Sequence, residues 1–224
     1  MVEISTSLLS VKKENVIKTI YNLETAGTDY FHIDVMDGKF VENDTNNLML
    51  EYCEYLENIT NVPMEIHLMV EDIESYIDSY IIFNPNTIIF HYEAVKDREE
   101  LFKLINKVKD HNCKVGVSIK PNTKVEEIYD ILPYIHTVLV MTVEPGKGGQ
   151  KLISETIDKI VKLKQYIDEK KLETEIEADG GINLENIQTV KEAGCDIVVA
   201  GTSIISTDDY KKVIKNMKSD IDNY

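Results

Sequence analysis

The chain has 224 residues and a formal net charge of −16, from 40 acidic and 24 basic side chains. This charge excludes nucleic acid as a general partner, because an acidic surface repels phosphate backbones. Hydrophobic residues make up 43% of the chain and charged residues 29%, which excludes wholesale disorder and is typical of a globular protein. The length fits one domain, and we expect a single domain over residues 1–224.

The cysteines and the apolar runs bear on where the protein acts. Cys53, Cys113 and Cys195 are far apart and in no CxxC spacing, so neither a disulfide framework nor a cysteine-rich metal site is expected. The first residues lack the basic segment and long apolar run of a signal peptide. No apolar run approaches the roughly 18 residues of a membrane span. We therefore expect a cytoplasmic protein with no membrane partner.

Short apolar runs rich in β-branched residues alternate along the chain with longer segments whose apolar residues recur three or four positions apart. The short runs predict eight strands, at residues 3–9, 29–35, 62–70, 87–92, 114–119, 136–143, 173–178 and 196–200. The longer segments predict helices that include residues 14–26, 97–111, 124–132, 153–170 and 184–193. Gly27 and Gly194 follow two of these helices, where a left-handed residue commonly ends a helix.

The alternation of eight strands with helices predicts an α/β fold in which a parallel sheet closes into a single-domain TIM (β/α)8 barrel. An open, doubly wound sheet is the alternative. In such a barrel, the side chains at the C-terminal ends of the strands face the active site. Polar residues that interrupt a run at that end are therefore the candidates for function.

Polar residues stand at the C-terminal ends of several predicted strands. His32 and Asp34 are two apart in FHIDVMDG, so they project from the same face of a strand, while His67 lies in EIHLMV and Asp179 in IEADGG. Each alone fits a core or turn residue, but four unpaired polar groups at one barrel mouth would be costly. Two imidazoles and two carboxylates predict a site for one divalent ion of zinc, iron, cobalt or manganese. For His91, at the same mouth, a substrate contact, an ordering role behind a ligand and a structural role are all open.

Glycine-bearing turns follow the last three predicted strands. They read EPGKGGQ at residues 144–150, GG at residues 180–181 and GTS at residues 201–203. Glycine lets backbone N–H groups approach an anion closely, and the loops after the seventh and eighth strands are the usual phosphate site of these barrels. We expect a phosphate site here. The alternatives are tight turns alone or, for residues 146–149, a mobile lid.

These motifs together resemble the ribulose-phosphate 3-epimerase family over nearly the whole chain. The matching segments are SLLS at residues 7–10, FHIDVMDGKFV at 31–41, EIHLMV at 65–70, VMTVEPGKGGQ at 140–150, IEADGGIN at 176–183 and VAGTS at 199–203. The resemblance implies a TIM barrel that uses a divalent metal to interconvert ribulose 5-phosphate and xylulose 5-phosphate, in the pentose phosphate pathway. It also implies a homo-oligomer whose small-molecule partner is a ketose phosphate.

The resemblance also implies residue roles. The implied metal ligands are His32, Asp34, His67 and Asp179, and the implied acid/base residues are Asp34 and Asp179. The implied substrate contacts are Ser7, Met36, His67, Met69, Met141, Gly146, Gly148, Gly149, Gly180, Gly181, Gly201 and Thr202. Inversion next to a ketone needs one carboxylate on each face of a planar enediolate, whose charge a metal would stabilise. The methionines would form an apolar collar around the reacting carbon.

Two single positions and one loop depart from the family pattern. Glu42 and Thr6 stand where the family usually has proline, and Lys147 stands where it has an aromatic residue. Glu42 is followed by NDTNN at residues 43–47 instead of small and apolar residues. Because this loop borders the sugar, a hexulose-phosphate 3-epimerase acting on allulose 6-phosphate is an alternative. A barrel that binds a sugar phosphate without catalysis is another, which the two retained carboxylates argue against.

Overall fold

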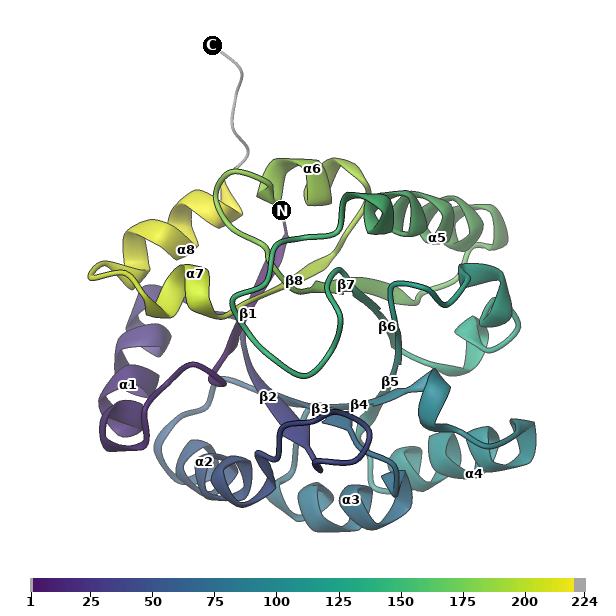
Figure 1. Cartoon of the computed structure of the whole chain (residues 1–224), viewed down its shortest axis with the longest axis horizontal. Helices are drawn as coiled ribbons and strands as arrows, with labels where there is room; N and C mark the ends of the chain where they lie inside the picture. The colour runs from purple at the N-terminus through teal and green to yellow at the C-terminus, as the bar shows by residue number, and fades with distance from the viewer. Residues whose placement is uncertain (1, 220–224) are drawn as a thin grey trace.

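A computed structural model describes residues 2–219, and in it eight parallel strands close into a barrel in chain order (Figure 1). The strands are β1 (Glu3–Ser7), β2 (Tyr30–Met36), β3 (Met64–Met69), β4 (Thr87–His91), β5 (Lys114–Ile119), β6 (Thr137–Met141), β7 (Glu175–Asp179) and β8 (Ile197–Ala200). Each strand pairs with its neighbours in sequence, and β8 closes the ring on β1. The predicted closed barrel is confirmed, and the open sheet is wrong. The expectation of one domain also covers residues 1 and 220–224, which lie outside the described residues.

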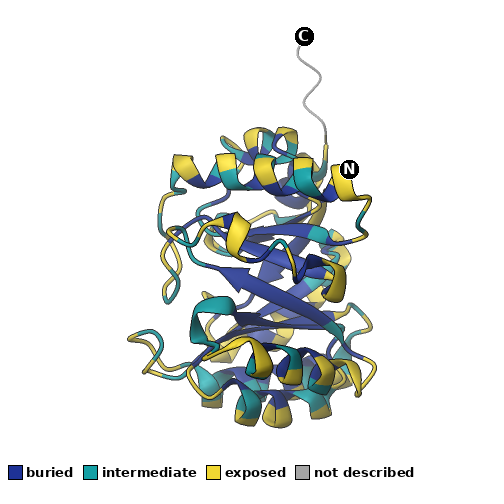
Figure 2. Ribbon diagram, turned by 90° about the vertical axis from the view of Figure 1, so that its right-hand side faces the viewer, coloured by how far each residue is buried: buried dark blue, intermediate teal, exposed yellow. Residues whose placement is uncertain are grey.

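Helices surround the barrel on its outer side (Figure 1). They are α1 (Val16–Ala26), α2 (Asn46–Ile59), α3 (Ile73–Tyr80), α4 (Arg98–Lys109), α5 (Ile157–Lys170), α6 (Ile187–Glu192), α7 (Thr202–Ile205) and α8 (Tyr210–Lys218). Gly27 ends α1 with φ of 87°, in the left-handed conformation that its position predicts. Figure 2 shows buried strands at the centre and exposed residues on the outer helix faces. Among the described residues, no helix combines the length and the apolar character needed to cross a membrane.

The predicted helix at residues 124–132 is wrong. The β5–β6 connection instead contains two 3₁₀ turns, Val125–Glu127 and Leu132–Tyr134. Pro133 lies in the second turn, where it lacks an N–H and disfavours α-helical geometry at the preceding residue. The stretch before it is about two turns long, too short to be a stable helix by itself. Its apolar residues are nevertheless buried, so their spacing reflects core packing and not an α-helix.

The strands separate two apolar cores of different size. The larger lies between strands and helices, and a smaller one contains Ile89, Leu139, Met141, Val143 and Val199. Side chains alternate between the two faces of a strand, so residues two apart share a face. The same alternation buries several polar side chains on the strands: Ser5, His32, Glu65, His67, His91, Ser118 and Glu177. The polar cluster among them is the part of the barrel that bears on function.

Candidate metal centre and active site

The four predicted metal ligands meet at the C-terminal end of the barrel. His32 and Asp34 come from β2, His67 from β3 and Asp179 from the end of β7, and one ligand atom of each lies within 4.8 Å of the other three. His67 Nδ1 is 3.6 Å from Asp34 Oδ1 and 3.6 Å from Asp179 Oδ2. His32 Nε2 lies 3.3 Å from the same His67 nitrogen. The two carboxylates therefore flank an imidazole, with the second imidazole beside it.

Burial divides this cluster into two levels. The side chains of His32 and His67 are fully buried, whereas 7% of the Asp34 side chain and 14% of the Asp179 side chain are exposed. The imidazoles thus lie below, and only the carboxylates reach solvent. A molecule entering from the barrel mouth meets Asp34 and Asp179 first.

Opposite charges hold the cluster together. Burial opposes ionisation of Asp34, but the attraction and hydrogen bonding of His32 outweigh it and hold the pKa of Asp34 well below its usual range. Burial also disfavours the charged form of His32, but Asp34 and Glu65 outweigh it and raise the pKa of His32. The pKa of His67 is raised because Asp179 and Asp34 outweigh its burial in the same way. Asp34 is therefore an ionised carboxylate at neutral pH, even though it is buried.

The donor set fits a divalent metal ion. His32 Nδ1 lies 2.7 Å from Glu65 Oε1, and His67 Nε2 lies 3.0 Å from His91 Nε2. Each imidazole thus has a hydrogen-bond partner on its outer nitrogen and turns the inner nitrogen toward the carboxylates. Such outer partners orient ligating imidazoles in metal sites, and a mixed nitrogen and oxygen set suits zinc, iron, cobalt or manganese. These four residues could therefore hold one ion.

Two buried glutamates beneath the cluster were not assigned a role from the sequence. Glu65 and Glu177 each stand two residues before a predicted ligand, His67 and Asp179, so they share its strand face one layer deeper. Glu177 Oε1 lies 3.6 Å from His32 Nδ1, and neither Glu177 oxygen has a hydrogen-bond partner among the described residues. Burial and the nearby Glu65 charge raise the pKa of Glu177 well above its usual range. The spacing of two residues between each glutamate and the ligand that follows it could have identified this deeper layer from the sequence.

A cavity of about 330 Å³ opens above the carboxylates. Its lining includes every predicted substrate contact except His67, which lies buried beneath: Ser7, Met36, Met69, Met141, Gly146, Gly148, Gly149, Gly180, Gly181, Gly201 and Thr202. Ser7 Oγ donates a hydrogen bond of 2.6 Å to Asp34 Oδ2. The cavity therefore has carboxylates and methionines at one end and glycines at the other.

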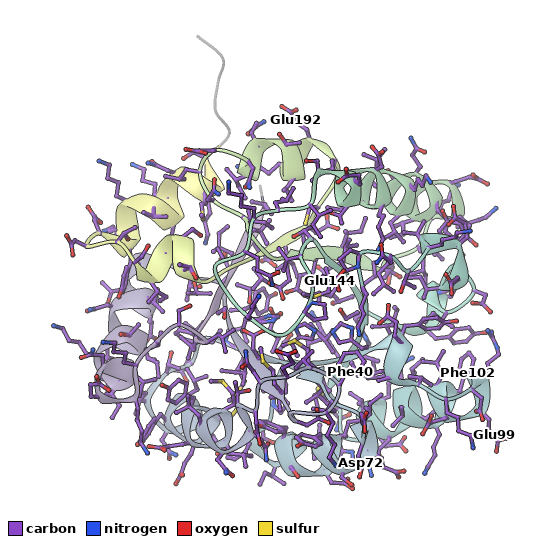
Figure 3. All side chains as sticks on the ribbon, in the orientation of Figure 1. Phe40, Asp72, Glu99, Phe102, Glu144 and Glu192 are labelled. Atoms are coloured by element: carbon purple, nitrogen blue, oxygen red, sulfur yellow. The ribbon has the colours of Figure 1, made fainter. Side chains whose placement is uncertain are left out.

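Two loops border the mouth of the cavity. The loop after β6 reaches over the centre of the ring in Figure 1, and Glu144 of this loop is labelled there in Figure 3. Asn43, in the β2–α2 loop, donates a hydrogen bond of 2.6 Å from Nδ2 to the carbonyl oxygen of Gly146. Lys147 is exposed and lines the cavity, whereas Glu42 is exposed and outside its lining. The altered β2–α2 loop is thus hydrogen-bonded directly to the loop after β6, residues 144–150, which we call the glycine loop.

Comparison with known proteins identifies a family. The model of the ribulose-phosphate 3 epimerase family matches residues 3–205. The chain is 38% identical to the ribulose-phosphate 3-epimerase of Methanocaldococcus jannaschii, with 97% of this chain and 90% of the relative aligned. It is 36% identical to the ribulose-phosphate 3-epimerase of Bacillus subtilis, with 97% and 99% aligned. The ribulose-phosphate 3-epimerase of Escherichia coli is 32% identical, with 97% and 95% aligned.

Solved structures agree on the fold. A 3-hexulose-6-phosphate synthase from Salmonella typhimurium superposes with a TM-score of 0.71 at 14% identity, covering 96% of each chain. The protein KGPDC from Streptococcus mutans has a TM-score of 0.70 at 9% identity, and the match covers 97% of this chain and 96% of that one. At these identities the likeness is one of fold alone. The full-length sequence matches, in contrast, show that this chain belongs to the ribulose-phosphate 3-epimerase family.

Proposed function

We propose that this enzyme inverts carbon 3 of D-ribulose 5-phosphate to give D-xylulose 5-phosphate. The observation that carries the proposal is the pair of carboxylates, Asp34 and Asp179, which flank His67 at the base of a cavity. The other end of this cavity is lined by glycines that suit a phosphate group. A ketose phosphate fits both ends, because its carbon skeleton would meet the carboxylates and its phosphate group would meet the glycines.

The two carboxylates supply the proton transfers. The proton on carbon 3 is acidic because a ketone is adjacent, so one carboxylate removes it and the other returns a proton to the opposite face. The reverse reaction exchanges these roles. The hydrogen bond from Ser7 Oγ to Asp34 Oδ2 orients one of the two bases. When bound by His32, Asp34, His67 and Asp179, a divalent ion supplies Lewis-acid stabilisation of the negative charge that develops on the substrate oxygens.

Three methionines make the reacting end of the cavity apolar. Met36 is opposite Met69 in the β2–β3 register, and Met141 is opposite Asp179 in the β6–β7 register. All three line the cavity and are almost fully buried. Thioether side chains are apolar and polarizable, so they exclude water around a carbon that carries developing negative charge.

The phosphate end of the proposal rests on close backbone approach. Ser10 Oγ and Thr202 Oγ1 are 3.2 Å apart, and a Cβ added at Gly148 would lie 3.5 Å and 3.6 Å from these two oxygens. Gly180 and Gly181 have φ of 124° and 69°, a backbone conformation that glycine adopts readily. An anion could thus contact loops from three parts of the chain. Backbone N–H groups in these loops would favour the anion locally, despite the overall negative charge of the protein.

Alanine at Gly181 is expected to weaken substrate binding. Its Cβ would lie 2.3 Å from the backbone nitrogen of Leu152 and 2.8 Å from the carbonyl oxygen of Gln150, so the glycine loop must move. We expect KM for ribulose 5-phosphate to rise between about tenfold and 100-fold. We expect the free energy of unfolding to fall by about 1–3 kcal/mol. Steady-state kinetics and thermal denaturation measure the two effects.

Gly27→Ala is the matched control for Gly181→Ala. Gly27 also has a positive φ, of 87°, but a Cβ there would meet nothing within 4 Å, and the residue ends α1 and is not among the residues that line the cavity. The control should lose stability without any change in KM. An unchanged KM in Gly181→Ala would contradict a substrate contact at this loop.

Relative activity on pentose and hexose phosphates tests the proposed substrate. We expect kcat/KM for ribulose 5-phosphate to exceed that for allulose 6-phosphate by at least about tenfold. This is a modest discrimination for a pocket that must reject a substrate with one extra carbon unit. Turnover of the hexose phosphate alone would show that the substrate is a hexulose phosphate and would leave the two-carboxylate mechanism unchanged. Thermal protection by both sugars without turnover of either would instead favour a binding protein.

Location and assembly complete the proposal. The resemblance to the family favours a cytoplasmic enzyme that assembles as a homo-oligomer. Light scattering on the purified protein measures the oligomeric state directly, and a monomer at micromolar concentration would contradict the proposed homo-oligomer.

A further inference from the structure

A line of three side chains, two buried and one partly exposed, runs outward from the metal centre. His67 Nε2 lies 3.0 Å from His91 Nε2, and His91 Nδ1 lies 3.2 Å from Glu93 Oε2. Both imidazoles are fully buried, and 20% of the Glu93 side chain is exposed. His91 ends β4 and Glu93 follows it in a 3₁₀ turn, Tyr92–Ala94, so this line reaches the centre from a strand that supplies no predicted ligand.

Glu93 is held in place from the side away from His91. Its Oε1 accepts a hydrogen bond of 2.7 Å from the backbone N–H of Lys120 and another from the Thr123 hydroxyl. Its Oε2 is thereby left facing His91 Nδ1. An ionised carboxylate only accepts hydrogen bonds, so the proton on this contact belongs to His91 Nδ1.

This proton fixes the direction of the next hydrogen bond. His91 is enclosed by the rings of Phe40 and His67, with centroids 4.9 Å and 5.0 Å away, and a second proton would leave a cation in this enclosure. With its proton on Nδ1, neutral His91 presents an accepting Nε2. His67 must then donate from its own Nε2. Its Nδ1 is therefore the nitrogen that can bind a metal, since an imidazole coordinates through an unprotonated nitrogen.

We propose that Glu93 and His91 are positioning residues, which set the tautomer of His67 so that its Nδ1 faces the metal with a lone pair. The inference rests on the metal centre of the proposed function and is independent of which sugar the enzyme takes. It gives His91 the ordering role among the three that its sequence position left open.

Glu93→Gln reverses the relay, the hydrogen bonds that run from Glu93 through His91 to His67, with little change in the shape of the side chain at position 93. The Lys120 N–H and the Thr123 hydroxyl keep the amide oxygen on their side, so the amide N–H₂ faces His91. His91 Nδ1 must then accept, Nε2 donates to His67, and the proton of His67 moves to Nδ1. We expect the affinity for Zn²⁺, measured by competition with a chelator, to fall between about 10-fold and 100-fold.

Glu100→Gln is the matched control for the loss of a carboxylate. Glu100, in the first turn of α4, accepts a hydrogen bond of 2.6 Å from the backbone N–H of Lys96 in the β4–α4 connection, and it makes no contact with His91 among the hydrogen bonds of the described residues. Its Zn²⁺ affinity should equal that of the wild type. Equal Zn²⁺ affinities for Glu93→Gln and Glu100→Gln would overturn the proposal.

Nitrogen NMR on the zinc-loaded wild type tests the relay without any substitution. We expect His91 to carry its proton on Nδ1, and His67 to carry its proton on Nε2 with Nδ1 bound to zinc. A proton on Nε2 of His91 would overturn the proposal. If the protein shows the expected tautomers but does not epimerise ribulose 5-phosphate, the relay stands and the proposed function fails.

Discussion

Asp179→Asn should lower kcat for ribulose 5-phosphate by at least about 10³-fold, because an amide neither accepts nor returns the proton of carbon 3. Asp179 extends from the end of β7 into the cavity and is the more exposed of the two carboxylates. The change preserves size, so the fold should persist, with a thermal midpoint close to that of the wild type. Steady-state assays in both directions, started from either epimer, measure the loss.

Two controls separate proton transfer from metal binding in this variant. Zinc content is measured alongside activity, because Asp179 is also a candidate ligand. Asp168→Asn makes the same chemical change on α5, where the side chain is 61% exposed and pairs with Lys164, and it should leave kcat unchanged. Turnover of zinc-loaded Asp179→Asn within about tenfold of the wild type would remove Asp179 from the acid/base pair.

His67→Ala should lower the affinity for Zn²⁺ by more than about 100-fold, which exceeds the usual cost of losing an outer partner of a ligand. The change removes a candidate ligand whose Nδ1 lies 3.6 Å from each of the two carboxylates. It also leaves Asp34 and Asp179 without the imidazole between them. Metal content after dialysis against a weak chelator, followed by activity with added zinc, measures both consequences.

His111→Ala is the matched control for His67→Ala. His111 is exposed in the turn after α4, and its Nδ1 lies 2.9 Å from the carbonyl oxygen of Lys107 in the last turn of that helix. Its loss should leave zinc content unchanged. If His67→Ala retains as much zinc as His111→Ala, His67 does not belong to the ligand set.

The residues at the strand ends could be placed from the sequence because a strand has a simple period. Two residues apart on one strand share a face, and parallel strands in a closed barrel bring their C-terminal ends to one rim. This reasoning brought His32, Asp34, His67 and Asp179 to one mouth, where the structure also has them. The helical spacing of three or four residues could not distinguish a helix at residues 124–132 from the two 3₁₀ turns Val125–Glu127 and Leu132–Tyr134, because both bury residues three apart.

The group behind His91, Glu93, depends on a contact between segments distant in sequence. Glu93 lies beyond the end of β4, so no strand period applies to it. Its role depends on the Lys120 backbone, 27 residues away, which occupies one of its carboxylate oxygens. Such partners follow from the pairing of neighbouring strands, here β4 with β5, and not from local pattern. They are visible only once the fold is known.

Exchange of solvent deuterium into carbon 3 of ribulose 5-phosphate is the most direct test of the central claim. A proton removed by one carboxylate and replaced by the other must come from solvent, so the xylulose 5-phosphate formed in D₂O should carry deuterium at carbon 3. Exchange should stop when a chelator removes the metal and return when zinc is restored. Conversion without deuterium in the product, or exchange that survives chelation, would contradict the account.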